Sequence, residues 1–207
     1  MKTLLLSKIG VFETILFAIY FIILFLTSLC PIYRILWCIE SGIGVALFIF
    51  YLLFLRNGIN WTKTSTFIII AACIMQTIGG FYTFQNVPYG EFIFILGALG
   101  RNNFDRLGHL FCGLLSFPLL EIIEKKQLIN SIFLATLLSI LIMSGVGSLY
   151  EQIEWGIVQI VEHKTGLTYI AKQGDEWDPQ ADMFCCSVGS LIGAICYIVI
   201  NKLRNKN

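Results

Sequence analysis

Six apolar runs, separated by short polar breaks, dominate the pattern of hydrophobic and polar positions along the chain. Their approximate limits are 12–30, 36–55, 65–81, 107–120, 132–150 and 183–201. Because a helix of about 20 apolar residues crosses the hydrocarbon core of a bilayer, the pattern predicts six transmembrane helices. The run 107–120 is short and contains Gly108 and His109. A bundle of five spanning helices, with the two termini on opposite sides, is therefore the alternative.

The composition indicates that the whole chain, and not only its apolar segments, belongs to a membrane protein. The chain of 207 residues has 57% hydrophobic and 13% charged side chains, and its mean hydropathy is +0.81. So few charged residues cannot cover the surface of a soluble protein of this length. We therefore expect an all-α membrane protein with one polytopic domain over residues 1–207, in contact with the lipid bilayer. The formal net charge of +1 indicates no nucleic-acid partner, and the pattern does not predict an oligomeric state.

The lysines and arginines of the short loops predict the orientation. With six spans, one side collects both termini and Lys2, Lys8, Arg56, Lys63, Lys125, Lys126, Lys202, Arg204 and Lys206. The other side keeps Arg34, Arg101, Arg106, Lys164 and Lys172. Since positive charge concentrates in cytoplasmic loops, both termini are predicted to be cytoplasmic. The fourth span then begins, the fifth ends and the sixth begins on the outer side, where residues distant in sequence can meet.

The segment RNNFDRLGHLFCG (101–113) places a carboxylate and an imidazole on one helical face. Asp105 and His109 are four residues apart, and side chains at this spacing are neighbours on a helix. Such a pair orients the imidazole and raises its basicity, whether it acts as a base or as a metal ligand. Arg101 and Arg106 flank the pair and are predicted to hold a phosphate or carboxylate. The structural alternative is that Asp105 caps the helix and His109 bonds a neighbouring helix.

The segment GVGSLYEQIEWGIV (145–158) contains a pair of carboxylates at the end of a long apolar run. Glu151 and Glu154 are three residues apart and share a helical face. Their charges repel unless both face water, one is protonated or a cation lies between them. The apolar pattern resumes at Trp155 and Ile157, so the pair indicates a functional site near membrane depth. The alternative is an interfacial helix whose acids face water.

The segment QGDEWDPQADMFCC (173–186) places several acids before the last apolar run. Asp178 followed by Pro179 is typical of a helix N-cap and the first helical residue, so a helix start explains Asp178. Asp182 lies one turn inside that helix, on the same face as Asp178 and near the positive end of the helix dipole. Capping explains Asp182 less well and Asp175 hardly at all, so both are predicted to belong to the outer-side cluster.

Taken together, these residues resemble the YjdF-type family of predicted multi-pass bacterial inner-membrane proteins, whose domain has no assigned function. The resemblance rests on GGFYTFQNVPYGE (79–91), RNNFDRLGHLFCG (101–113), SLYEQIEW (148–155) and QGDEWDPQADM (173–183), and it covers roughly the C-terminal two thirds of the chain. It implies localisation in the bacterial inner membrane. The family pattern often has a histidine where this chain has Phe81 and another near Gln76, so the resemblance does not support a histidine-rich centre that includes the third helix.

The leading hypothesis is a metal-dependent membrane hydrolase or transferase that acts on a lipid-linked or small anionic substrate at the outer face. The candidate catalytic residues are Asp105, His109, Glu151 and Glu154, the candidate substrate-binding residues are Arg101, Arg106 and Asp175, and the candidate metal ligands are Glu151, Glu154, Asp178 and Asp182. Carboxylate-rich ligation suits Mg²⁺, Mn²⁺ or Ca²⁺, and Zn²⁺ is also compatible with it.

Two other hypotheses use the same residues. In a small transporter the carboxylates would bind a proton or a cation, although the acids crowd at one end and the sequence has no inverted repeat of the kind that many carriers show. In a non-catalytic scaffold or sensor, Arg101 and Arg106 would neutralise Glu151, Glu154 and Asp182 in a structural ion-pair network. The sequence alone leaves the three hypotheses open.

Overall fold

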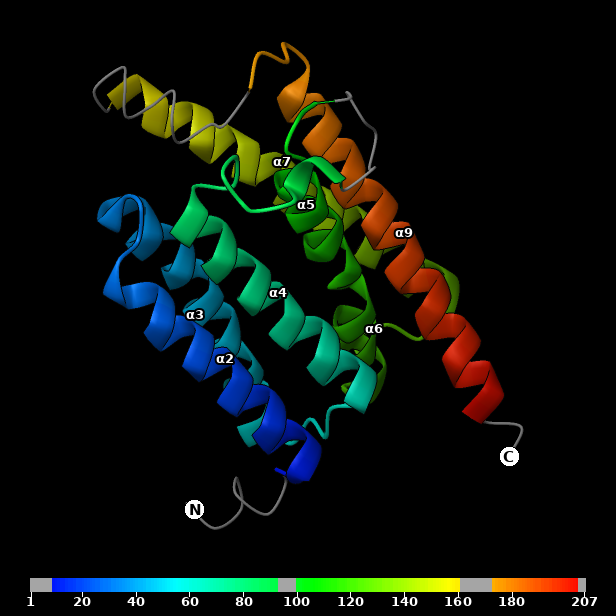
Figure 1. Ribbon diagram of the computed structural model, residues 1–207. Coiled ribbons are helices and arrows are strands. Elements are labelled where there is room, and N and C mark those ends of the chain that lie inside the picture. Colours follow the sequence, from blue (N-terminus) through cyan, green and yellow to red (C-terminus); the bar gives the residue numbers. More distant parts are fainter. Residues whose placement is uncertain (1–8, 93–99, 161–172, 205–207) are drawn as a thin grey trace.

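The computed structural model shows an all-helical bundle and describes residues 9–92, 100–160 and 173–204 (Figure 1). Its helices are α2 (Val11–Leu29), α3 (Arg34–Arg56), α4 (Lys63–Tyr82), α5 (Phe104–Leu114), α6 (Ser116–Lys125), α7 (Ile132–Ile160) and α9 (Asp178–Arg204), with a short 3₁₀ helix η1 (Gly90–Phe92). Helices α5 and α6 together form one span, so six segments are long and apolar enough to cross a membrane. The prediction of six spans is confirmed, and the alternative of five spans is wrong.

The boundaries of three spans differ from the predicted limits. Helix α7 continues beyond residue 150 to Ile160, and α9 begins at Asp178 rather than at residue 183. In both cases buried acidic side chains extend the helix past the end of the apolar run. The fourth span runs from Phe104 to Lys125 and is divided at Leu115. Pro118 lacks an N–H to donate to the carbonyl of Leu114, which accounts for the break.

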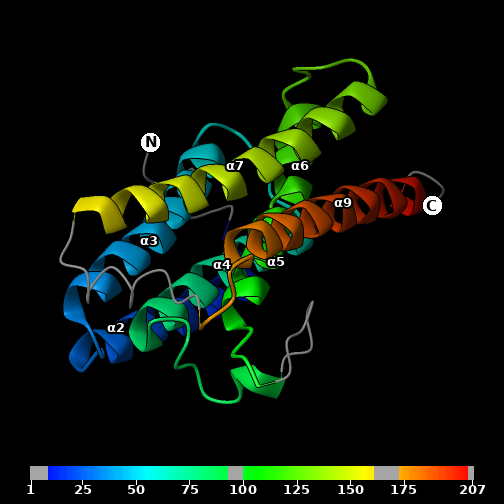
Figure 2. The ribbon, with the colours of Figure 1, turned by 90° about the horizontal axis from the view of Figure 1, so that it is seen from above.

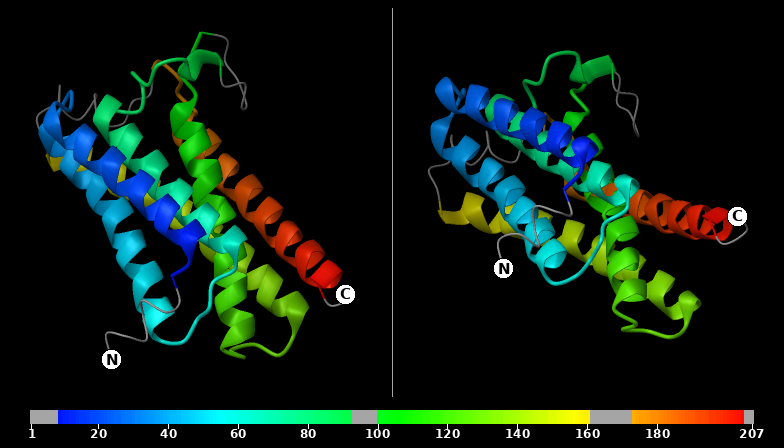
Figure 3. Two further views of the ribbon diagram at one scale, coloured as in Figure 1. Left: turned by 60° about the horizontal axis from the view of Figure 1, so that its bottom comes forward. Right: turned by 90° about the horizontal axis from the view of Figure 1, so that it is seen from below.

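Two groups of helices make up the bundle. Figure 3 shows α2, α3 and α4 side by side, with α5, α6 and α9 beyond α4. An aromatic cluster of Tyr20, Phe48 and Tyr51 packs against Ile70 inside the first group. A second cluster, which includes Phe117 and Tyr197, joins α4, α6, α7 and α9. The core therefore lies between helices, whereas the outward faces carry exposed apolar side chains that a bilayer would solvate.

Glycines bring α5 and α9 into backbone contact. A Cβ atom at Gly113 would overlap the carbonyl oxygen of Cys186, and a Cβ atom at Gly189 would overlap that of Leu110. Small residues at such positions allow two helices to approach closely in a membrane. The contact holds α5 against α9 one to two turns from His109 and Asp182, which are discussed below.

A polar cluster ties α6 to the start of α4. The Glu121 carboxylate accepts hydrogen bonds from the N–H of Thr62 at 2.9 Å, from the Thr62 hydroxyl at 3.0 Å and from Nζ of Lys125 at 2.5 Å. The Thr62 hydroxyl in turn accepts from the N–H of Ser65, as an N-cap residue does. This end of the bundle, called the terminal end below, is also where α2 begins and α9 ends (Figure 1). The opposite end is called the site end.

We predict that Gly189→Ala destabilises the protein, because the new methyl group must separate α5 from α9. Overpacking of this kind costs about 1–3 kcal/mol, measured as the free energy of unfolding in detergent. Gly145→Ala is the matched control in α7, since a Cβ atom there meets nothing within 4 Å. Equal stability of the two variants would contradict the close contact.

The cytoplasmic position of both termini stays a prediction, and some of the charges that support it, Lys2, Lys8, Lys164, Lys172 and Lys206, lie outside the described residues. It predicts that a cysteine placed at the exposed Glu176, in a chain freed of its seven cysteines, reacts with an impermeant maleimide in intact cells. Reaction only after permeabilisation would show the opposite orientation. A cysteine at Asn57, at the terminal end, should behave in the reverse manner.

Candidate functional site

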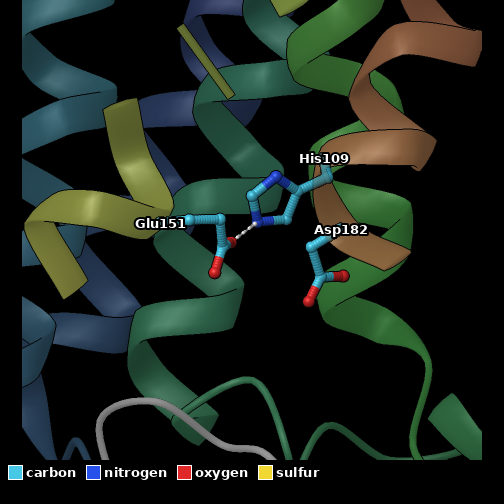
Figure 4. A group of neighbouring side chains, drawn as sticks. All are labelled: His109, Glu151 and Asp182. Atoms are coloured by element: carbon cyan, nitrogen blue, oxygen red, sulfur yellow. Dashed lines mark ion pairs between the residues drawn. The ribbon is translucent and has the colours of Figure 1, made fainter. Parts of the chain in front are cut away.

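Three side chains from three helices converge near the site end (Figure 4). His109 of α5, Glu151 of α7 and Asp182 of α9 each offer one ligand atom, and these atoms lie within 4.8 Å of one another. Nε2 of His109 is 2.9 Å from Oε1 of Glu151 and 3.8 Å from Oδ1 of Asp105. The structure thus brings together four of the predicted residues. His109 lies five residues into α5, which is about 7.5 Å along the helix axis.

Asp182 has an unsatisfied oxygen in this cluster. The residue is only 2% exposed, and its Oδ1 atom has no hydrogen-bond partner within the described parts of the chain. A buried carboxylate oxygen without a donor or cation is costly. Asp105 and Glu151 add further negative charge beside a single imidazole. The cluster has more carboxyl groups than the histidine can neutralise, so either a carboxyl group is protonated or a bound cation supplies the positive charge.

Arg101 and Arg106 form a second layer with the acids that precede and begin α9. Arg106 Nη2 lies 2.6 Å from Oδ2 of Asp175 and 3.6 Å from Oδ1 of Asp178. Arg101 forms an ion pair with Asp178 and lies 3.9 Å from Asp175. The N–H of Trp177 and then the Arg106 guanidinium lower the pKa of Asp175 below its usual value. Both arginines are buried, so this layer is a compact ion-pair network at the start of α5 and α9.

Hydrogen bonds connect the loop before α5 to the loop before α9 and so hold the arginine layer together. The N–H of Asn102 donates to Oε1 of Gln173 and the carbonyl of Asn102 accepts from Nε2, both at 2.9 Å. The Asn102 side chain donates to the carbonyl of Val87 at 2.7 Å and accepts from the N–H of Phe104. Gly90 packs directly against this amide, where a Cβ atom would overlap it. Two polar side chains thus position Arg101 and Asp175 opposite each other.

Two of the predicted metal ligands lie apart from the histidine. Asp178 pairs with the arginines, and Glu154 is buried one turn beyond Glu151 but is not one of the three side chains that meet at His109. The Glu154 carboxylate is nevertheless close enough to those of Asp105, Glu151, Glu40 and Asp182 to interact electrostatically with them. The functional roles assigned to all these residues stay predictions, whereas their positions are now defined.

Sequence reasoning missed a third polar group, which comes from α3, α4 and α7. The Tyr150 hydroxyl donates to Oε2 of Glu40 at 2.7 Å, and Nε2 of Gln76 contacts both Glu40 and, at 3.2 Å, the Tyr150 oxygen. Tyr150 also packs edge-on against His109, with ring centroids 5.6 Å apart. Glu40 is only 3% exposed. Its position inside the apolar run 36–55 was the available signal, because ionisable residues inside a span are rare and usually functional.

A cavity of about 210 Å³ lies beside both this third group and the His109 cluster. Gln76, Tyr150, Asp105 and His109 line it together with mostly apolar residues. Residues of α3, α4, α5 and α7 therefore surround a common space, and its polar lining residues come from α4, α5 and α7.

Comparisons with known proteins agree with this architecture. Residues 12–202 match the sequence profile of a family described as "Predicted membrane protein (DUF2238)". The chain is 32% identical over 131 residues to the inner membrane protein YjdF of Escherichia coli (strain K12), an alignment that covers 63% of this chain and 62% of that relative. No solved structure matches the chain. The predicted family resemblance and multi-pass membrane localisation are confirmed.

We predict that Asp178→Asn destabilises the protein by about 3 kcal/mol, because removing one partner of a buried ion pair leaves an uncompensated charge. Asparagine has nearly the same shape as aspartate, so the change removes the charge of the ion pair and little else. The free energy of unfolding in detergent is the measurement. Glu176→Gln removes an exposed acid of the same loop and should change that free energy by no more than about 0.5 kcal/mol. Similar values for both variants would exclude a stabilising role for the arginine layer.

Proposed function

The chain belongs to the family "Predicted membrane protein (DUF2238)", and from that premise we propose that it is a metal-dependent membrane hydrolase or transferase acting on a lipid-linked or small anionic substrate. The observation that carries the proposal is the convergence of His109, Glu151 and Asp182 from three helices, with their ligand atoms within 4.8 Å of one another. No two of these residues share a helix, so helix periodicity alone does not explain their meeting.

The spacing of the three side chains suits a divalent cation after small side-chain movements. Protein nitrogen and oxygen ligands lie about 2.0–2.6 Å from such ions, so two ligands on opposite sides of an ion are about 4–5 Å apart. The unsatisfied Oδ1 of Asp182 and the excess of carboxylates both favour a cation. One imidazole with two carboxylates suits Mn²⁺ or Zn²⁺ well, and Mg²⁺ through the carboxylates.

The remaining residues take roles that follow from their distances to this centre. Asp105, 3.8 Å from Nε2 of His109, and Glu154, buried one turn from Glu151, are the acid–base candidates that could accept a proton from a metal-bound water. Such a water is a strong nucleophile at neutral pH. Arg101, Arg106 and Asp175 form the layer beyond it, and a substrate anion at the site end would meet the two guanidinium groups there.

The ion pairs of the arginine layer favour the competing scaffold hypothesis. Arg101 and Arg106 are engaged by Asp175 and Asp178, which is the arrangement expected of a structural network. In the His109 cluster, however, Asp182 keeps an oxygen without a hydrogen-bond donor in the described structure. Metal binding separates the two hypotheses, because only the metal-dependent one requires it.

We predict that purified protein equilibrated with Mn²⁺ or Zn²⁺ retains about one ion per chain, and that Asp182→Asn or Glu151→Gln lowers the affinity at least about 10-fold, as losses of even outer-shell partners do. Dialysis followed by elemental analysis is the measurement. Glu91→Gln, which removes an exposed acid of η1, is the control for nonspecific binding and should leave the metal content unchanged. Equal metal content in wild type and Asp182→Asn, or none in either, would leave the structural network as the explanation.

A further inference from the structure

The cavity beside His109 is a pocket with one polar end. Its apolar wall includes Ile43 and Leu47 of α3, Ala72 of α4 and Val146 of α7. Its polar lining residues, Asp105, His109, Gln76 and Tyr150, each lie nearer the site end of their helices than the apolar residues of the same helices. The pocket therefore runs from a polar region near the site end toward the apolar middle of the bundle.

The mouth of the pocket opens toward lipid rather than toward water. Ile43 and Val146 both line the pocket and are 41% and 42% exposed at the same time. Each lies near the middle of its helix, within Arg34–Arg56 and Ile132–Ile160. Helix α7 crosses one side of the bundle (Figure 2) and packs mainly against α9 rather than α3. An opening between α3 and α7 at this depth meets the hydrocarbon core of a bilayer.

We propose that this pocket binds the hydrocarbon chain of a membrane lipid, which enters sideways between α3 and α7 and places its polar end beside His109. Apolar walls accept a hydrocarbon chain and give a polar molecule no hydrogen bonds. The polar residues at the other end provide donors and acceptors for a head group. This inference deepens the proposed function by naming a lipid as the substrate class; it rests on that function for the reaction but not for the binding.

A photoreactive lipid tests the proposal. The protein is reconstituted in vesicles of phosphatidylethanolamine and phosphatidylglycerol that contain phosphatidylglycerol with a diazirine in its acyl chain, and cross-linked residues are identified by mass spectrometry after irradiation. Lipids around the protein can label exposed residues on any helix. Only a chain inside the pocket can label Ala72, which is buried and lines it. We expect adducts at Ala72 or at the neighbouring pocket residue Met75.

Two substitutions in α7 sharpen the test. Val146→Trp fills the mouth and should reduce the adducts at Ala72 and Met75 to the background of the unirradiated sample. Leu141→Trp adds the same bulk at an exposed position of α7 that does not line the pocket, and should leave those adducts unchanged. Labelling confined to exposed residues, or equal labelling of Ala72 in both variants, would overturn lateral entry.

The same labelling in the presence of a chelator separates this inference from the metal-dependent function. Labelling of Ala72 by a protein that binds no metal would keep the lipid pocket and reject the metal-dependent function. Metal binding without labelling of Ala72 would reject the lipid pocket and leave the metal centre to act on a small anion.

Discussion

The backbone contact between α5 and α9 is the constraint on which the polar part of this molecule depends. Gly113 and Gly189 allow the two helices to touch, and His109 lies one turn from Gly113 whereas Asp182 lies two turns from Gly189. The glycine contact and the residues of the His109 cluster thus lie on the same face of each helix. Because the glycines remove side-chain bulk from the contact, the acids and the imidazole near the helix starts face each other rather than lipid.

The buried charged residues form separate groups around the contact between α5 and α9. The His109 cluster is buried, the arginine layer closes it toward the site end, and the Glu40 group adjoins the cavity on the side of α3. Burial removes the water that solvates each carboxylate, so each layer needs its own positive charges or hydrogen-bond donors. The arginine layer has two guanidinium groups for Asp175 and Asp178. The His109 cluster has one imidazole beside Asp105, Glu151 and Asp182.

The sequence predicted the helices better than the contacts between them. Apolar runs predicted six spans because the bilayer sets the length of a helix, and Asp178-Pro179 predicted the start of α9 because capping is local. The pair of Asp105 and His109 followed from helix periodicity. Periodicity cannot say which face meets which. The sequence left Arg101 and Arg106 to a substrate anion or to an ion-pair network, and their pairing with Asp175 and Asp178 appeared only in the structure. Glu40 was missed because its partners Gln76 and Tyr150 are neutral and distant in sequence.

The length of α7 has a mechanical consequence. Its 29 residues span about 43 Å at 1.5 Å per residue, whereas the hydrocarbon core is about 30 Å thick. A helix longer than the membrane tilts or protrudes, and α7 crosses the bundle obliquely (Figure 1), with Trp155 exposed beyond the polar cluster. A change of bilayer thickness would therefore change the tilt of α7, whose Tyr150 hydroxyl is hydrogen-bonded to Glu40 of α3.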